Sequence, residues 1–304
     1  MTDAREPGRP HPLAPAAIGM LESVHQHRVI TTRQLNELHR PGRALRGTQH
    51  QLAVLARLGL IAYVRDNAGP RLWYLTERGA DAVEAIPLRT ETRRKLLRPE
   101  QVAGPLRHHT IAVNDVGLAF VRAARERGDD CGPQSWRHEI AHPLGPPPGQ
   151  RASEQLIADA LLTYQRNEPD GGASFHYRFI ELDRATMPVD TLAAKLARYA
   201  RLYRHTGVAP STSAARPRPL WRDRYPVFPG VLLVLAGDRR ERLHRRRAIV
   251  LRLCAQDPLL KDTPAVTLAC CLLDDLAEQG PFAAVFHRPA APDDPTDWIA
   301  DAQS

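Results

Sequence analysis

The side chains with the clearest potential for chemistry are carboxylates inside apolar, β-prone stretches. Asp159 lies in LIADALL, and Glu181 and Asp183 lie two residues apart in FIELD, which places both on one face of a strand. A carboxylate among apolar neighbours is costly unless it is paired or bound to a cation. In adjacent strands Asp159 and Glu181 would reach one hard cation, and Mg²⁺ prefers such oxygen ligands. Asp183, and Glu139 in SWRHEIAH, are expected to act as auxiliary carboxylates.

Lys195 is the cation expected to work with these carboxylates. Only three of the 42 basic residues are lysines, and Lys195 lies in PVDTLAAKLARYARLYRHT, an amphipathic stretch that predicts a helix after the third strand. Its compact ammonium would stabilise the charge that develops during Mg²⁺-dependent hydrolysis. A second interpretation fits the same spacing equally well, namely a buried ion-pair cluster that holds the sheet together. Its members would be Asp159, Glu181, Asp183, Arg184 and Lys195.

The stretch HEIAH, from His138 to His142, matches the H-E-x-x-H pattern of zinc proteases. That pattern binds zinc only when both histidines lie one turn apart on a helix. Gly132–Pro133 and Pro143 flank the stretch and disfavour a helix there. We therefore predict a strand, and a zinc metalloprotease remains only a remote alternative. The strand would place Trp136, His138 and Ile140 on one face.

A second group of candidate residues is basic and polar and lies near the N-terminus. The stretches AAIGMLESVHQHR, TTRQLNEL and RGTQHQLAVLARLGL predict three helices, and the β-prone runs IAYVR and RLWYL predict a hairpin. This order is typical of a winged helix-turn-helix, whose second paired helix reads the DNA major groove. The expected DNA contacts are Arg43, Arg46, Thr48, Gln49 and His50 at the start of the third helix, and Arg65 and Arg71 on the wing.

The charge of this region agrees with a nucleic-acid partner. Residues 13–100 contain 14 Arg and Lys against 8 Asp and Glu, and they carry most of the net charge of +8. Such an excess favours contact with phosphates. The alternatives are a winged helix that contacts proteins and a plain helical bundle.

The composition excludes several classes of protein. The 304 residues are 43% hydrophobic and 25% charged, which is typical of a globular chain. The longest apolar run, Val231–Ala236, is far shorter than the ~20 residues of a membrane helix, and the N-terminus lacks a signal-peptide core. A cytoplasmic protein without a membrane partner is expected. The four cysteines show no C-x-x-C spacing and are expected to be buried thiols.

The elements that position these residues predict an α+β protein. We expect a disordered lead over 1–12, the winged helix-turn-helix over 13–86, and a basic linker over 87–105. An α/β domain with a sheet of mixed direction would follow over 106–288, with the order α-β-β-β-α-β-α-β, and then an acidic tail over 289–304.

The order of strand with Asp159, strand with Glu181, helix and strand resembles the PD-(D/E)XK nuclease core. Ala158 stands where that motif has proline, and Asp183 stands where it has lysine. Lys195 would then be a lysine that has moved to the following helix. This resemblance implies a Mg²⁺-dependent DNA endonuclease with Asp159 and Glu181 as metal ligands.

A resemblance to the replication-relaxation family covers roughly residues 15–250. It rests on GLIAYV, LWYLTERGA, HHTIAVNDV, SWRHE and IADALL, and most specifically on FIELDRAT followed by KLARYARLY and FPGVLLVLAGDRRERL. It implies a winged-helix protein that binds double-stranded DNA in replication, relaxation or transfer of plasmids and other mobile elements. Other replication or transfer proteins and a second copy of the chain are expected partners. The alternative to nicking is a non-catalytic transcriptional or replication regulator with a dead nuclease fold.

Overall fold

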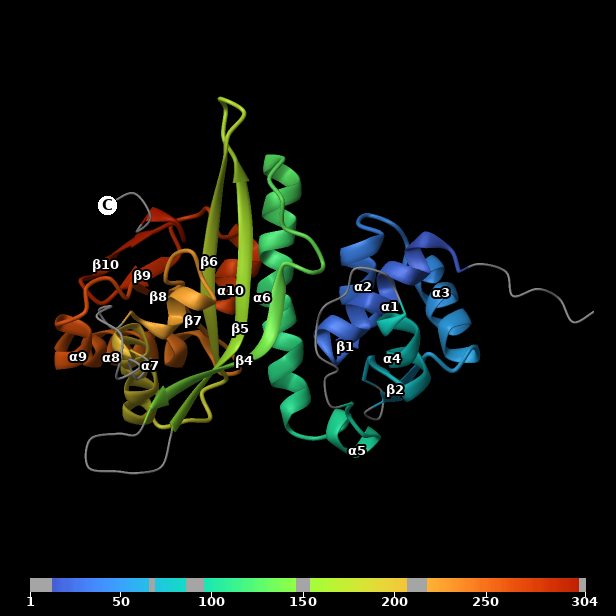
Figure 1. Ribbon diagram of the computed structural model, residues 1–304, viewed down its shortest axis with the longest axis horizontal. Helices are drawn as coiled ribbons and strands as arrows, with labels where there is room; N and C mark the ends of the chain where they lie inside the picture. The colour runs from blue at the N-terminus through green and yellow to red at the C-terminus, as the bar shows by residue number, and fades with distance from the viewer. Residues whose placement is uncertain (1–12, 66–68, 86–95, 146–153, 207–217, 301–304) are drawn as a thin grey trace, which may run out of the picture. The chain divides into compact units, whose positions relative to one another are not determined.

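The computed structural model describes residues 13–65, 69–85, 96–145, 154–206 and 218–300 (Figure 1). The chain divides into two compact units, one up to Arg107 and one from His108. The expected lead over 1–12, the tip of the hairpin, residues 87–95 of the expected linker and the last four residues lie outside the described residues.

The N-terminal unit combines helices with a small antiparallel sheet. Its sheet has the strand order β1-β3-β2, and the order of three helices followed by a hairpin agrees with the expectation apart from the two-residue strand β1. The elements are α1 (Pro15–His27), β1 (Ile30–Thr31), α2 (Thr32–His39), α3 (Leu45–Arg57), β2 (Ile61–Arg65), β3 (Arg71–Leu75), α4 (Glu77–Glu84) and α5 (Pro99–Val102).

Local signals explain where α2 and α3 begin and end. The Thr31 side chain accepts a hydrogen bond from the Gln34 amide, and the Gln34 side chain accepts one from the Thr31 amide, which together form a capping box. Gly59, with φ of +70°, follows the end of α3. Leu58 lies beyond the last helical residue and is 40% exposed.

The C-terminal unit contains a seven-stranded mixed sheet with the order β10-β9-β8-β7-β6-β5-β4. Strands β6, β7 and β8 run parallel, whereas the other neighbours are antiparallel. The elements are α6 (Leu106–Arg127), β4 (Trp136–Gly145), β5 (Glu154–Asn167), β6 (Ala173–Asp183), α7 (Val189–Arg204), the 3₁₀ helix η1 (Leu220–Asp223), β7 (Gly230–Leu235), α8 (Arg240–Gln256), α9 (Pro258–Lys261), β8 (Leu268–Leu272), α10 (Leu273–Gln279), β9 (Phe286–Arg288) and β10 (Ala291–Thr296).

The end of the chain differs from the expected acidic tail over 289–304. Ala291–Thr296 pairs with β9 as the edge strand of the sheet, and Trp298 is buried against the rings of Phe120 and Tyr164. An edge strand faces solvent and tolerates charge and proline. Because of its acidic residues and prolines, the composition of this segment predicted a tail, whereas the segment forms an edge strand.

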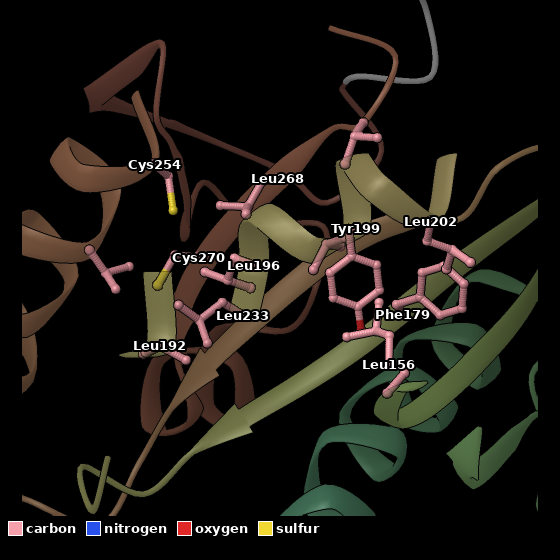
Figure 2. Packing of buried hydrophobic residues seen from close by; sticks show 14 of the residues in the cluster. Leu156, Phe179, Leu192, Leu196, Tyr199, Leu202, Leu233, Cys254, Leu268 and Cys270 are labelled. Atoms are coloured by element: carbon pink, nitrogen blue, oxygen red, sulfur yellow. The ribbon is translucent and has the colours of Figure 1, made fainter. Parts of the chain in front are cut away.

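Helices cover both faces of the sheet (Figure 1). Helix α6 packs on one face, where Gly117 allows the indole of Trp136 to approach its backbone. Helices α7 and α8 pack on the other face, and their side chains form one apolar core with the strands (Figure 2). Phe179, Leu196 and Leu233 are fully buried in that core. No helix in the described part of the chain has the length and apolar character needed to cross a membrane.

Candidate functional site

The HEIAH stretch lies within β4 and not on a helix, which confirms the strand prediction. Trp136, His138 and Ile140 are all buried, but they do not share one face as expected. Trp136 and His138 contact α6, whereas Ile140 belongs to the core with α7 and α8. The Nε2 atom of His138 lies 2.9 Å from Oδ1 of Asn114, and that of His142 lies 2.7 Å from the Tyr225 hydroxyl. The two imidazoles therefore serve as hydrogen-bonded core groups in separate surroundings.

Asp159, Glu181 and Lys195 come together on the sheet, as the sequence predicted. The Nζ atom of Lys195, on α7, donates a hydrogen bond to Oε2 of Glu181 on β6 and lies 3.7 Å from Oδ1 of Asp159 on β5. Tyr199, one helical turn after Lys195, donates a hydrogen bond of 2.5 Å to Oε1 of Glu181. Both carboxylate oxygens of Glu181 thus have a partner on α7. The cluster formed by Asp159, Glu181, Lys195 and Tyr199 is called the acidic cluster below.

Asp159 is held from two further directions. The backbone amide of Leu182 donates a 2.8 Å hydrogen bond to its Oδ2 atom, and Nε2 of His109, on α6, lies 3.4 Å from its Oδ1 atom. The side chains of Asp159, Lys195 and His109 keep 17%, 22% and 31% of their surface exposed, against 2% for Glu181. The acidic cluster therefore meets solvent on the side of Asp159.

Burial and neighbouring charges shift the pKa values of Glu181 and Asp159 in opposite directions. Burial, followed by the negative charge of Asp159, raises the pKa of Glu181 to about 8. Burial also opposes ionisation of Asp159, but His109, Lys195 and the Leu182 amide outweigh it and lower its pKa. Burial opposes the charge of Lys195, yet the two carboxylates raise its pKa. Asp159 and Lys195 are therefore the charged members at neutral pH.

Asp183 and Glu139 do not join the acidic cluster, contrary to the expected auxiliary role. Asp183 accepts a 2.5 Å hydrogen bond from Nε of Arg246 on α8. Residues two apart on a strand are separated by about 6.6 Å, so Glu181 and Asp183 meet different helices although they share a face. Glu139 is exposed, with φ of +54°, between the paired residues His138 and Ile140.

The arrangement does not fit a Mg²⁺ ion between Asp159 and Glu181. The Lys195 ammonium occupies the position between the two carboxylates, and the Glu181 oxygens bind Lys195 and Tyr199. Within the described ranges, no group of three His, Cys, Asp or Glu side chains could hold a metal ion. The contacts instead match the second interpretation from sequence, a buried ion-pair cluster, with Tyr199 and His109 in place of Asp183 and Arg184.

In the N-terminal unit, most of the predicted DNA-contact residues on α3 and in the turn before it are exposed. Arg43, Arg46, Gln49 and His50 are exposed. Thr48 is an exception, because its side chain is fully buried and donates a 2.6 Å hydrogen bond to Asn36. Helical spacing explains the difference, since residue 48 lies on the same face as the buried Leu52 and Leu55.

Asn36 is a positioning residue that the sequence did not reveal. Besides accepting from Thr48, it donates a 2.9 Å hydrogen bond from Nδ2 to the Arg43 carbonyl. One side chain on α2 therefore fixes both the turn before α3 and the first turn of α3. An asparagine near the end of a short helix is the only sequence signal for this contact.

The hairpin presents a cationic and aromatic surface. Arg65 and Arg71 are directly opposed in the register of β2 and β3. The Arg71 guanidinium lies 4.6 Å from the ring centroid of Tyr63, which is 45% exposed and packs on Trp73. Tyr63 is a surface aromatic residue that sequence reasoning did not select.

Comparison with known proteins identifies the family. A family model described as Replication-relaxation matches residues 21–217, more than half of the chain. The matched range contains α3, the hairpin and the residues of the acidic cluster. No curated protein and no solved structure compared with the chain matches it. The family expectation drawn from sequence is confirmed: the chain belongs to the Replication-relaxation family.

Proposed function

We propose that the N-terminal unit is a winged helix-turn-helix that binds double-stranded DNA with α3 in the major groove. The exposed face of α3 is the observation that carries this proposal. Arg46, Gln49, His50, Ala53 and Arg57 are exposed at helical spacing, and α3 contains no acidic residue. Arginine and glutamine are the side chains that read guanine and adenine edges, and small Ala53 permits close approach of the helix.

The hairpin supports the same proposal. In winged helices the wing lies beside the recognition helix and contacts the DNA backbone. Arg65 and Arg71 supply two cations on neighbouring strands. Tyr63 provides a hydroxyl and an apolar ring beside Arg71. These groups suit phosphate and sugar contacts, which position a protein without reading sequence.

The biological setting follows from the family. We propose a role associated with plasmid replication, with other replication proteins and a second copy of this chain as partners. The C-terminal unit then acts as a non-catalytic scaffold, because the acidic cluster is internally paired and its lysine fills the place of a metal.

Binding to a labelled duplex, measured by fluorescence anisotropy at several salt concentrations, tests the DNA assignment. Affinity should fall steeply with salt, since phosphate contacts release counterions. Arg46→Ala and Gln49→Ala should each weaken binding to the preferred site by about 1–3 kcal/mol. Arg252→Ala removes an exposed charge from α8 in the other unit and serves as the matched control. Absence of duplex binding at about 50 mM salt would refute the proposal.

Mg²⁺-dependent DNA nicking is the second candidate function. The observation that favours it is the convergence of Asp159, Glu181 and Lys195 from β5, β6 and α7. Supercoiled plasmid incubated with Mg²⁺ or Mn²⁺ tests it. Nicking that disappears in Asp159→Asn, while duplex binding persists, would replace the scaffold role with a nuclease role. Absence of nicking with the native plasmid supports the scaffold.

A further inference from the structure

The C-terminal unit contains a cavity of about 350 Å³ beside the end of α8. Its walls come from the end of α8, from α9, from the start of β8 and from the turn between β9 and β10. The exposed residues Lys261 and Ala290 belong to its lining, so the cavity reaches the surface. A volume of this size lies within the usual range for small-molecule sites.

The deep wall of the cavity is apolar. Val266 and Leu268 are buried side chains that line it, together with Leu260 and the Cys254 thiol. Cys254 and Leu268 also belong to the core between α7, α8 and the sheet (Figure 2). Burial, followed by the nearby Asp257, raises the pKa of Cys254 to about 12, so the thiol stays uncharged and acts as an apolar wall group.

The charged side chains that line the cavity are all positive. Lys261 and Arg288 both line the cavity, and among its described lining residues none is acidic. Lys261 makes no ion pair with any residue in the ranges that the structure covers. It is also one of only three lysines in a chain of 42 basic residues. A cavity with apolar walls and two cations complements a molecule with an apolar body and one anionic group.

We propose that this cavity binds a small amphipathic anion, such as a medium-chain carboxylate. The apolar chain would lie against Leu260, Val266 and Leu268, and the carboxylate would meet the Lys261 ammonium and the Arg288 guanidinium. Charge-assisted hydrogen bonds to these cations select the anion over a neutral molecule of equal length. The site is distinct from the proposed DNA surface and does not depend on it.

Calorimetric titration of the full chain with decanoate, below its micelle concentration, tests the proposal. One equivalent should bind, and decanol, which has the same chain but no charge, should bind about tenfold more weakly. Lys261→Gln should weaken decanoate binding by about tenfold and leave decanol binding unchanged. Arg252→Gln, an exposed residue of α8 outside the cavity lining, is the matched charge control and should leave both unchanged.

A second pair of variants tests the location. Ala255→Phe places a ring in the cavity and should abolish binding of both probes, whereas Ala248→Phe, at an exposed position on the same helix, should not. Circular dichroism identifies any variant that fails to fold. Three results would each overturn the proposal: no decanoate binding by the wild type, equal affinity for decanoate and decanol, or decanoate binding that survives both Lys261→Gln and a folded Ala255→Phe.

Discussion

The hydroxyl of Tyr199 donates a 2.5 Å hydrogen bond to Oε1 of Glu181, a carboxyl group that is almost completely withdrawn from solvent. Tyr199 is itself fully buried, and its own pKa is raised by burial and then by Glu181, so it stays a hydrogen-bond donor. Burial of Glu181 and the negative charge of Asp159 outweigh the hydrogen bonds from Tyr199 and Lys195, so the raised pKa favours the protonated carboxyl group. The stability that Glu181 contributes to the folded protein should therefore fall as the pH rises.

The first prediction concerns this pH dependence. The pKa of Glu181 rises from its ordinary value of 4.5 to about 8, so the folded protein retains a proton that the unfolded chain releases. The stability from Glu181 is complete below about pH 4.5 and is lost as the pH rises to about 8. Relative to Glu181→Gln, the wild type should lose free energy of unfolding across this window. Urea unfolding of both proteins at several pH values measures it.

Tyr199→Phe is the control for this titration, because it removes the hydrogen bond but keeps the carboxyl group. It should lower stability at every pH and retain the pH trend. A wild-type advantage over Glu181→Gln that stays constant between pH 4.5 and 8 would contradict the raised pKa.

The second prediction concerns the coupling of Lys195 and Asp159, whose charged atoms lie 3.7 Å apart. Lys195→Met leaves Asp159 with only His109 and the Leu182 amide, and Asp159→Asn leaves Lys195 with only Glu181, so each should cost about 3 kcal/mol of stability. The double variant removes both charges, so its cost should fall below the sum by about 1 kcal/mol or more. Chemical unfolding of the four proteins measures the cycle.

Asp183 provides the comparison for that cycle, since it is bound to Arg246 and not to Lys195. The costs of Lys195→Met and Asp183→Asn should add within about 0.5 kcal/mol. Additive costs for Lys195 and Asp159 would contradict the ion pair between them. Strong coupling between Lys195 and Asp183 would contradict the pairing of Asp183 with Arg246.

Much of the fold could be predicted because local signals agree with tertiary contacts. Pro143 and the breakers before it indicated a strand for HEIAH, and the apolar spacing in RGTQHQLAVLARLGL indicated the helix α3. The edge strand β10 could not be predicted, because its sequence APDDPT has no alternation of apolar residues. The position of β10 depends on its pairing with β9 and on the burial of Trp298 against Phe120. These are tertiary contacts, which the local sequence pattern does not indicate.

The acidic cluster could be predicted only in outline. Asp159, Glu181 and Lys195 stood out because charge is rare inside apolar stretches. The partners of Asp183 and Asp159 come from α8 and α6, and no local spacing connects Arg246 or His109 with the strands that they meet. The register of helices on a sheet is set by packing, which a single sequence does not reveal.

The third prediction separates Thr48 from its exposed neighbours on α3. Thr48→Val keeps the buried volume but removes the hydroxyl that binds Asn36, so it should lower stability by about 1–3 kcal/mol. Because Thr48 is buried, the base preference of the DNA site should not change. Gln49→Ala should show the reverse pattern, with little loss of stability and altered preference. Thermal unfolding and binding to a set of single-base variants of the preferred duplex measure the two effects, and altered preference in Thr48→Val would contradict the assigned geometry.

The fourth prediction concerns the close contact of α6 with the sheet at Gly117. A Cβ atom at this position would lie 2.5 Å from the indole of Trp136, which is 1% exposed and cannot move aside without disturbing the core. Gly117→Ala should therefore lower the free energy of unfolding by about 1–3 kcal/mol, although alanine favours a helix. Gly132→Ala is the matched control, because nothing lies within 4 Å of its added Cβ atom. Denaturant unfolding followed by tryptophan fluorescence measures both variants. A Gly117→Ala protein as stable as the wild type would mean that α6 and β4 are farther apart than this contact requires.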